Sequence, residues 1–179
     1  MPDAVLHPSA MARCVTALVA FALGLSAACV GGAGSHEADA PVRAAATPKD
    51  VVAAARGVLE QWRQAQEVKS FELLAKLYVR DQDVVVVQEG APLIGWSSVS
   101  AMLQDRMTTA TAIHVRLKDV QVASVAPSVA SALATMTREV STGATTVTEI
   151  GTVTLVLRRA ETVGAPWLII AEHYSYKAH

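Results

Sequence analysis

The chain has 179 residues, a formal net charge of −1 at pH 7 and an apolar content of 52%, which is enough to build a buried core. Apart from Arg158-Arg159, lysine and arginine do not occur in runs. Proteins that bind nucleic acid usually carry a basic stripe or patch, so no nucleic-acid partner is expected.

The N-terminal segment has the composition of an export signal. No charged residue occurs from Cys14 to Ala28, and Arg13 precedes this stretch. The apolar run is about 15 residues long, too short to span a bilayer as a helix but suited to the core of a signal peptide. Residues 1–10 fit a signal poorly, which suggests that translation begins at Met11.

The predicted signal peptide, residues 1–28, ends in small residues directly before Cys29. This arrangement resembles a bacterial lipoprotein signal, in which the cysteine at the cut becomes the acylated N-terminus. The protein is then expected in the bacterial cell envelope, held to a membrane by its lipid anchor and facing the periplasm or the exterior. The alternative is an ordinary secretory signal, in which Cys29 has no special role.

Residues 29–47 combine glycines, alanines and scattered charges without apolar periodicity, and are predicted to form a flexible tether. The remaining residues, 48–179, have the length of one domain. Two amphipathic helices are expected at its start. Thr47 and Asp50 form a capping pattern before apolar residues at helical spacing, and Ser70 begins a second such pattern.

Strand-like sequence begins with the β-branched run 84–87, followed by a turn and a short return strand over 91–95. A third helix is expected to be capped by Ser97 and to continue to about Met107. Four long strands rich in β-branched residues then follow, at 112–125, 128–141, 146–160 and 166–177. Helices followed by a large antiparallel sheet indicate an α+β fold with the helices against one face.

This order of elements resembles the nuclear transport factor 2-like superfamily, in particular its SnoaL-like and calcium/calmodulin kinase association-domain branches. The similar residues are the last strand from Trp167 to Ser175, the segment Tyr78–Asp81, and Gly95-Trp96 before the third helix. The resemblance spans roughly residues 50–177. It implies a cone, in which a strongly bent antiparallel sheet wraps around three N-terminal helices and leaves a pocket.

His173 is the first candidate catalytic residue. Alternate strand residues share a face, which places His173 and Ser175 with Trp167 and Ile169. In the related families this face tends to be the concave one, where a histidine could act as a general base and Ser175 could bind a ligand. The alternative is a hydrogen-bonded histidine at a pocket rim or dimer seam.

Asp81 is the second candidate catalytic residue, because the resemblance places it near the pocket mouth at a helix end. The alternative is a solvated turn. Tyr78 and Trp96 are further candidate ligand-binding residues, with Trp96 either roofing the cavity or packing the third helix. Arg138 and Glu139 are neighbours in a strand, so one of these charges could point inward and would need a partner or a ligand.

Three functions fit these observations, because a fold implies a pocket but not its chemistry. The first is an exported domain that binds a small apolar molecule. The second is a SnoaL-like enzyme that uses Asp81 or His173 for proton transfer on a carbonyl compound. The third is a dimerisation module, and a homodimer is the expected assembly. No cofactor or metal is expected, since the sequence has no His-x-His pair, cysteine cluster or phosphate-binding glycine loop.

Overall fold

The computed structural model describes residues 46–162 and 164–178. Cys29, the predicted signal peptide and the tether up to residue 45 lie outside these residues, so export and lipid attachment stay predictions. Within the described part of the chain, none of the helices is both long and apolar enough to cross a membrane.

Helix α1 (Pro48–Glu67) is the long amphipathic helix predicted from the sequence. The Thr47 hydroxyl accepts a hydrogen bond from the Asp50 backbone N–H at 3.3 Å, and the Asp50 carboxylate accepts one from the Thr47 backbone N–H at 3.1 Å. This capping box satisfies N–H groups that have no partner within the helix. The apolar face, which includes Trp62, is buried along its whole length.

Replacing Thr47 with alanine is expected to lower the free energy of unfolding by about 1 kcal/mol, because the N-cap side chain is lost. Urea unfolding of the two proteins measures the difference. Thr47→Ser keeps a hydroxyl acceptor at the same position and serves as the control. Equal stability of the alanine and serine variants would show that the cap contributes nothing measurable.

The second helix, α2 (Phe71–Ala75), is capped by the Ser70 side chain and is shorter than expected. It ends before Tyr78, which forms an isolated parallel bridge with Ile169. The predicted hairpin is present as β1 (Val85–Gln88) and β2 (Ala91–Ile94).

The third helix, α3 (Trp96–Thr109), begins earlier than expected. Its N-cap is Gly95, which has a φ of +82° and a backbone N–H bonded to the Val84 carbonyl. Ser97 therefore lies inside the helix, and the predicted capping role of Ser97 is wrong. A positive φ is accessible to glycine without steric cost, so the turn and not a side-chain cap sets the start of this helix.

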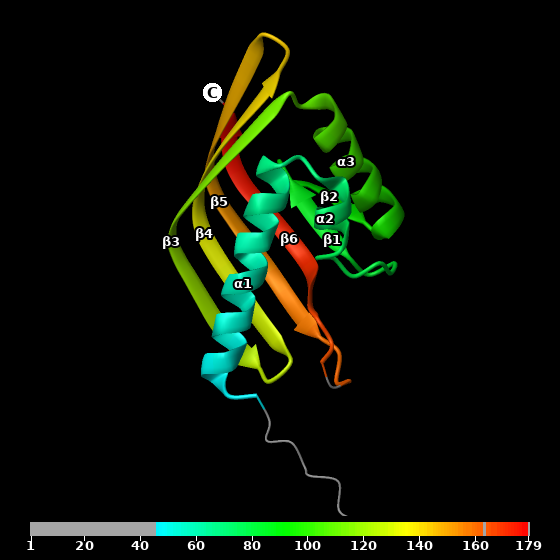
Figure 1. The fold of residues 1–179 in the computed structure, drawn as a ribbon, viewed down its shortest axis with the longest axis vertical. Coiled ribbons are helices and arrows are strands. Elements are labelled where there is room, and N and C mark those ends of the chain that lie inside the picture. The colour runs from blue at the N-terminus through cyan, green and yellow to red at the C-terminus, as the bar shows by residue number, and fades with distance from the viewer. Residues whose placement is uncertain (1–45, 163, 179) are drawn as a thin grey trace, which may run out of the picture. The chain divides into compact units, whose positions relative to one another are not determined.

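The four long strands are confirmed almost residue for residue. They are β3 (Ala112–Ala126), β4 (Val129–Thr142), β5 (Thr145–Arg159) and β6 (Trp167–Ala178). The six strands form one bent, unclosed sheet in the order β2-β1-β6-β5-β4-β3 (Figure 1). All neighbouring strands pair antiparallel except β1 and β6, which are parallel, so the sheet is mixed and not wholly antiparallel as expected.

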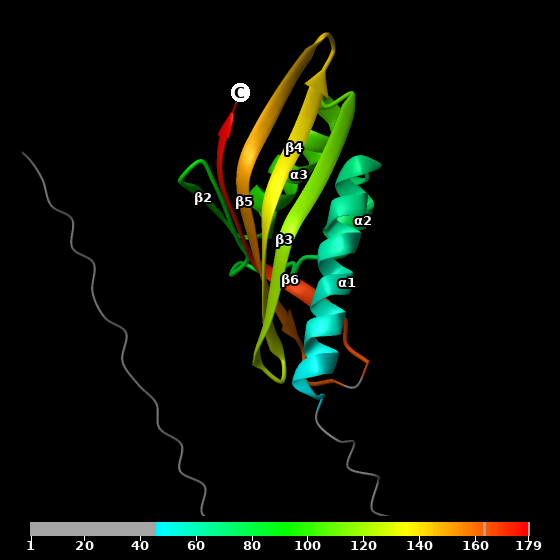
Figure 2. The same ribbon diagram turned by 90° about the vertical axis from the view of Figure 1, so that its left-hand side faces the viewer.

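Helix α1 lies across the concave face of the sheet. Helix α2 lies beside the C-terminal half of α1, and α3 lies next to α2 and the β1–β2 hairpin (Figure 1, Figure 2). The inner face of the middle strands is small and apolar along β4, with Ala130, Ala132 and Ala134 fully buried. These short side chains let the helix approach the sheet closely. The larger core side chains, such as Trp62 and Leu155, fill the space between the two layers.

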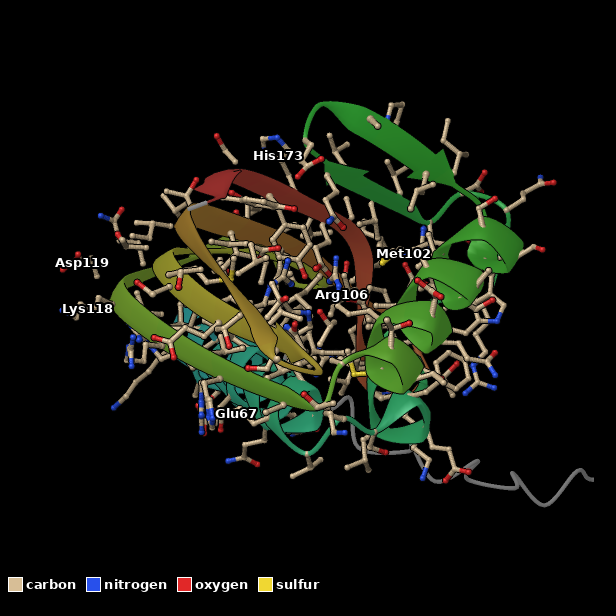
Figure 3. The ribbon with its side chains drawn as sticks, turned by 90° about the horizontal axis from the view of Figure 1, so that it is seen from above. Glu67, Met102, Arg106, Lys118, Asp119 and His173 are labelled. Carbon is tan, nitrogen blue, oxygen red and sulfur yellow. The ribbon has the colours of Figure 1, made fainter. Side chains whose placement is uncertain are left out.

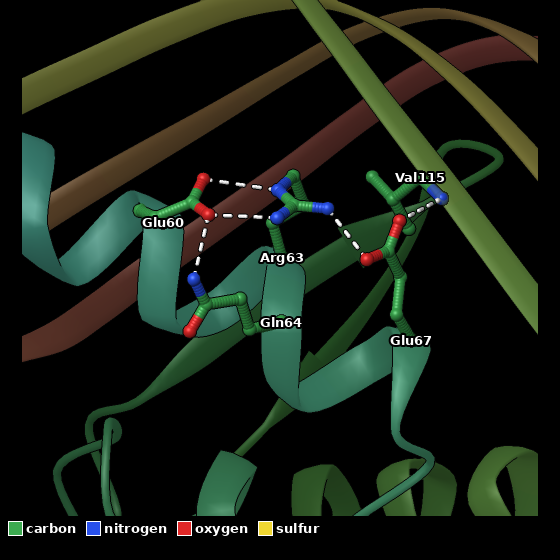
Figure 4. A network of polar contacts seen from close by, with 5 residues as sticks. All are labelled: Glu60, Arg63, Gln64, Glu67 and Val115. Atoms are coloured by element: carbon green, nitrogen blue, oxygen red, sulfur yellow. Dashed lines mark hydrogen bonds and ion pairs between the residues drawn. The ribbon is translucent and has the colours of Figure 1, made fainter.

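A polar network fastens the C-terminal half of α1 to the edge strand β3 (Figure 4). Arg63 bonds to Glu60 at 2.7 Å and to Glu67 at 2.5 Å. Glu67 in turn accepts a hydrogen bond from the Val115 backbone N–H at 3.2 Å. Since β3 has no neighbouring strand on this side, the carboxylate partly satisfies the open sheet edge.

Candidate functional site

A β-bulge in β6 decides which side chains face the interior. The pairing of β5 with β6 runs Val156↔Ala171 and then Leu157↔Ile169, so Ile170 is an extra residue with no partner. One extra residue reverses the alternation of side chains along a strand. Before the bulge Ile169 points inward, and after it the inward residues are Glu172 and Tyr174.

His173 and Ser175 therefore lie on the outer face, and both are exposed. The prediction that they share the concave face with Trp167 and Ile169 is wrong, because it assumed an unbroken alternation through Ile170. Figure 3 shows His173 on the outer side of β6, beside the hairpin, where its backbone pairs with Val87 of β1.

Asp81 lies in an exposed turn between α2 and β1. Its carboxylate accepts a hydrogen bond from the Asp83 backbone N–H at 2.9 Å, a short-range contact that shapes the turn. It forms an ion pair with Arg158 at 3.7 Å, and both side chains are largely solvated. This placement matches the solvated-turn alternative.

Of the four predicted ligand-binding residues, Tyr78 alone is fully buried. Its hydroxyl donates a hydrogen bond to Glu172 and accepts one from the Trp62 indole N–H at 3.2 Å. Trp96 is half-buried and packs with its ring centroid 6.3 Å from that of Tyr78. Tyr78 thus contacts the interior cluster directly, and Trp96 supports it from α3.

The interior of the sheet carries a carboxylate, Glu172, that is only 1% exposed. Its Oε2 atom accepts hydrogen bonds from the Tyr78 hydroxyl and from the Trp62 indole N–H, the latter at 3.2 Å. Its Oε1 atom is buried and has no hydrogen-bond partner among the residues that the structure describes, and the same holds for the hydroxyl of Tyr174 two residues along the strand. Buried polar atoms are nearly always paired with protein, water or ligand.

Burial and the charge of Glu172 raise the pKa values of both nearby phenols. For Tyr78 burial is the larger cause and the Glu172 carboxylate the second, and the same order holds for Tyr174. Both effects favour the protonated phenol. Tyr78 and Tyr174 therefore remain neutral hydrogen-bond donors throughout the physiological range of pH.

A buried ion pair lies beside this carboxylate. Arg138 of β4 is completely buried and donates from Nε to Glu149 at 2.5 Å and from Nη1 to the Gln66 side-chain oxygen at 3.1 Å. Its guanidinium lies 4.6 Å from the ring centroid of Tyr174. Arg138 is thus the inward member of the Arg138-Glu139 pair, and Glu139 bonds to Arg116 on the outer side.

Burial tends to lower the pKa of the Arg138 guanidinium. Electrostatic interactions with Tyr174 and with the Glu149 and Glu172 carboxylates outweigh burial, and the net pKa is raised. Arg138 is therefore a permanent cation. We call Arg138 and five other interior side chains the inner polar cluster: Gln66, Tyr78, Arg138, Glu149, Glu172 and Tyr174.

A second arginine reaches the cluster from α3. Arg106 donates a hydrogen bond to Gln88 of β1, and Gln88 in turn donates to the Tyr176 hydroxyl at 2.8 Å. The Arg106 guanidinium lies 5.6 Å from the Tyr174 ring centroid. Figure 3 shows this side chain extending from α3 towards the concave side of the sheet. These partly buried residues form a polar rim around Tyr174.

A groove of about 490 Å³ lies elsewhere, between α1 and the edge strand β3. Arg63 and Arg116 line it, but both are neutralised by glutamates that lie on or beside the groove. Its other cation on β3, Lys118, is exposed at the outer edge of the sheet (Figure 3). None of the residues that line the groove belongs to the inner polar cluster, so we place the candidate site on the concave face.

A model of the SnoaL-like domain family matches residues 55–179, well over half of the chain. The chain belongs to the SnoaL-like domain family. No curated protein matches the chain. The inner polar cluster of this SnoaL-like domain lies within the matched residues, on α1 and the three strands β4, β5 and β6 and in the segment after α2.

Solved structures share the fold. A candidate dehydratase of the nuclear transport factor 2-like family from Streptomyces avermitilis is 26% identical, with a TM-score of 0.63 over 71% of this chain and 96% of that one. A nuclear transport factor 2-like superfamily protein from Salmonella enterica is 15% identical, with a TM-score of 0.65 over 73% and 94%. A candidate scytalone dehydratase from Novosphingobium aromaticivorans is 12% identical, with a TM-score of 0.61 over 70% and 83%.

Sequence reasoning missed most of the polar cluster of this SnoaL-like domain. Glu172 interrupts the apolar run of the last strand, and Gln66 ends the buried face of α1. A charged or amide residue at an otherwise apolar position is the signal that could have identified both. The unbroken alternation that placed His173 on the inner face would also place Tyr174 on the outer face.

Proposed function

We propose that this SnoaL-like domain binds a small carbonyl compound on its concave face and transfers a proton with Glu172. The observation that carries this proposal is the pair of unpartnered atoms, Glu172 Oε1 and the Tyr174 hydroxyl, buried together in the interior. One is a hydrogen-bond acceptor that can take a proton, and the other is a donor. A ligand that lies between them would satisfy both.

The chemistry follows from the roles of these two groups. Glu172 Oε1 removes a proton from the carbon next to the carbonyl. The C–H electron pair forms the new carbon–carbon double bond, and the π pair of the carbonyl bond moves onto its oxygen. The Tyr174 O–H stabilises the charge on that oxygen by hydrogen bonding. Tyr78 and Trp62 hold the other oxygen of Glu172, so the carboxylate keeps one orientation during the reaction.

Two further observations support an enzyme over a purely apolar binding pocket. Ligand sites for apolar molecules carry few polar groups, whereas this interior contains Arg138, Glu149 and Glu172. Candidate dehydratases are also among the structures that share the fold. A dehydration can begin with removal of a proton next to a carbonyl group, the step that we assign to Glu172 in place of Asp81 or His173.

The test is exchange of carbon-bound hydrogen for deuterium. Small ketones such as cyclohexanone and acetophenone are incubated with the full chain in D₂O, and loss of the α-proton signal is followed by NMR. We expect Glu172→Gln to slow exchange by about 10²- to 10⁴-fold, as loss of a general base does. Tyr174→Phe is expected to cost about 10²-fold through the lost donor.

Asp81→Asn and His173→Ala are the controls, and both are expected to retain the wild-type exchange rate, because Asp81 lies in an exposed turn and His173 points to the outer face of the sheet, opposite to Glu172. Exchange that persists in Glu172→Gln would exclude Glu172 as the base. Ketone binding without any exchange in the wild-type protein would instead favour the binding domain without turnover.

A further inference from the structure

Beside the proton-transfer pair, two nitrogen atoms of the inner polar cluster are buried and lack hydrogen-bond partners within residues 46–162 and 164–178. They are Nη2 of Arg138 and Nε2 of Gln66, on side chains that are 0% and 1% exposed. The two side chains are tied together, because Arg138 Nη1 donates to Gln66 Oε1 at 3.1 Å. Both free atoms therefore belong to one small, rigid unit.

The chemistry of these two nitrogen atoms determines which kind of group can bind to them. Each is a donor only, so the complementary group must present acceptor oxygens. One donor belongs to a guanidinium, which forms its strongest hydrogen bonds with anionic oxygens and often engages two of them at once. A buried donor without an acceptor is destabilising, which argues that something occupies this position in the working protein.

The surrounding charges separate the interior into two ends. Arg138 and Arg106 flank the Tyr174 ring at 4.6 Å and 5.6 Å, so the donor end is positively charged. Glu172 lies at the other end, with Tyr78 and Trp62. Glu149 compensates only the Nε side of Arg138, at 2.5 Å. A ligand that is anionic at one end and gives up a proton at the other fits this arrangement.

We propose that the ligand of this SnoaL-like domain is a small oxo or hydroxy carboxylic acid, whose carboxylate is bound by Arg138 Nη2 and Gln66 Nε2. The proposal rests on the proposed function in one respect, that the ligand occupies the concave face. It adds the class of compound and the residues that recognise it. Arg138 and Gln66 bind and orient the acid, and Glu172 and Tyr174 act on its carbonyl end.

The test compares acids with their neutral esters. The probes are 4-oxopentanoate and 4-hydroxyphenylacetate, each beside its methyl ester, and their dissociation constants are measured by ligand-observed NMR titration of the full chain. We expect each acid to bind the wild-type protein at least ~10-fold more tightly than its ester, since only the acid presents a charged, two-oxygen acceptor.

Gln66→Glu is the decisive variant. It has nearly the same shape and still accepts from Arg138, so the fold is expected to persist, but it replaces the free donor with a negative acceptor. Acid binding should weaken at least ~10-fold while ester binding changes little. Arg138→Lys keeps the positive charge but loses the planar guanidinium that can bind two oxygens at once, so it should reduce the preference for the acid. Arg116→Gln, on the outer face, should leave it intact.

Equal binding of acid and ester, absence of binding by both acids, or an acid preference that survives Gln66→Glu would overturn the proposal. Its failure can be told apart from that of the proposed function. If acids bind through Gln66 and Arg138 and the wild-type protein exchanges no α-protons, the proposed class of ligand is supported and the proposed proton transfer is excluded. If ketones exchange through Glu172 without any preference for acids, the reverse holds.

Discussion

Replacing Gly151 with alanine is expected to lower the free energy of unfolding by about 3 kcal/mol or more. Gly151 lies in β5 opposite Tyr176 of β6. A Cβ atom at this position would lie 1.9 Å from the Ser175 carbonyl oxygen and 2.5 Å from the Tyr176 Cα. Both are backbone atoms, so no side-chain rotation can relieve the contact and the two strands must separate.

Urea unfolding measures this loss, and Gly57→Ala provides a control in the same protein. Gly57 lies in α1, where an added Cβ meets no atom within 4 Å. Alanine is the better helix former, so this variant is expected to gain about 0.5–1 kcal/mol. If Gly151→Ala proved as stable as the wild-type protein, β5 and β6 would have to lie farther apart than the structure places them.

Replacing Arg138 with methionine is expected to lower the free energy of unfolding by about 3–5 kcal/mol, because it leaves the buried Glu149 carboxylate without its partner. The chain offers a matched comparison in the neighbouring strand pair, because Arg138–Glu149 joins β4 to β5 and Arg116–Glu139 joins β3 to β4. Arg116 and Glu139 are joined at 2.5 Å, the same distance as Arg138 and Glu149, but lie on the outer face with 62% and 32% of their side chains exposed.

Arg116→Met is therefore expected to cost at most about 1 kcal/mol, as solvated ion pairs do. The double variant Arg138→Met/Glu149→Gln should recover part of the lost stability, because the unpaired negative charge of Glu149 is removed as well. Thermal or urea unfolding of the four proteins gives the comparison. Similar losses for Arg138→Met and Arg116→Met would contradict the burial that the structure gives to Arg138.

The elements of the fold could be predicted from the sequence because their signals are local. The capping residues Thr47 and Ser70 mark two helix starts, and the four long strands are bounded by prolines and glycines. The bend of the sheet and its parallel β1–β6 pair have no comparable signal, since they depend on contacts between residues far apart in the chain. The bend of the sheet was predicted from the family resemblance alone.

The candidate site could be predicted only in part. Tyr78, a predicted ligand-binding residue, lies in the interior, and one of Arg138 and Glu139 was expected to point inward without a way to choose between them. That choice depends on the pairing register of β3, β4 and β5, which sets Arg138 opposite Glu149. An unbroken alternation through Ile170 would place Glu172 and Tyr174 on the outer face, and no residue near Ile170 indicates the bulge.

The bulge at Ile170 has a consequence for any comparison of this chain with its relatives. Two SnoaL-like domains can match letter for letter along the last strand and yet present opposite sets of side chains to the substrate, if only one of them contains the extra residue. A gapless sequence alignment would then equate His173 of this chain with a residue that points the other way. Functional motifs in this strand should be compared by the direction of their side chains, with a one-residue gap allowed at Ile170.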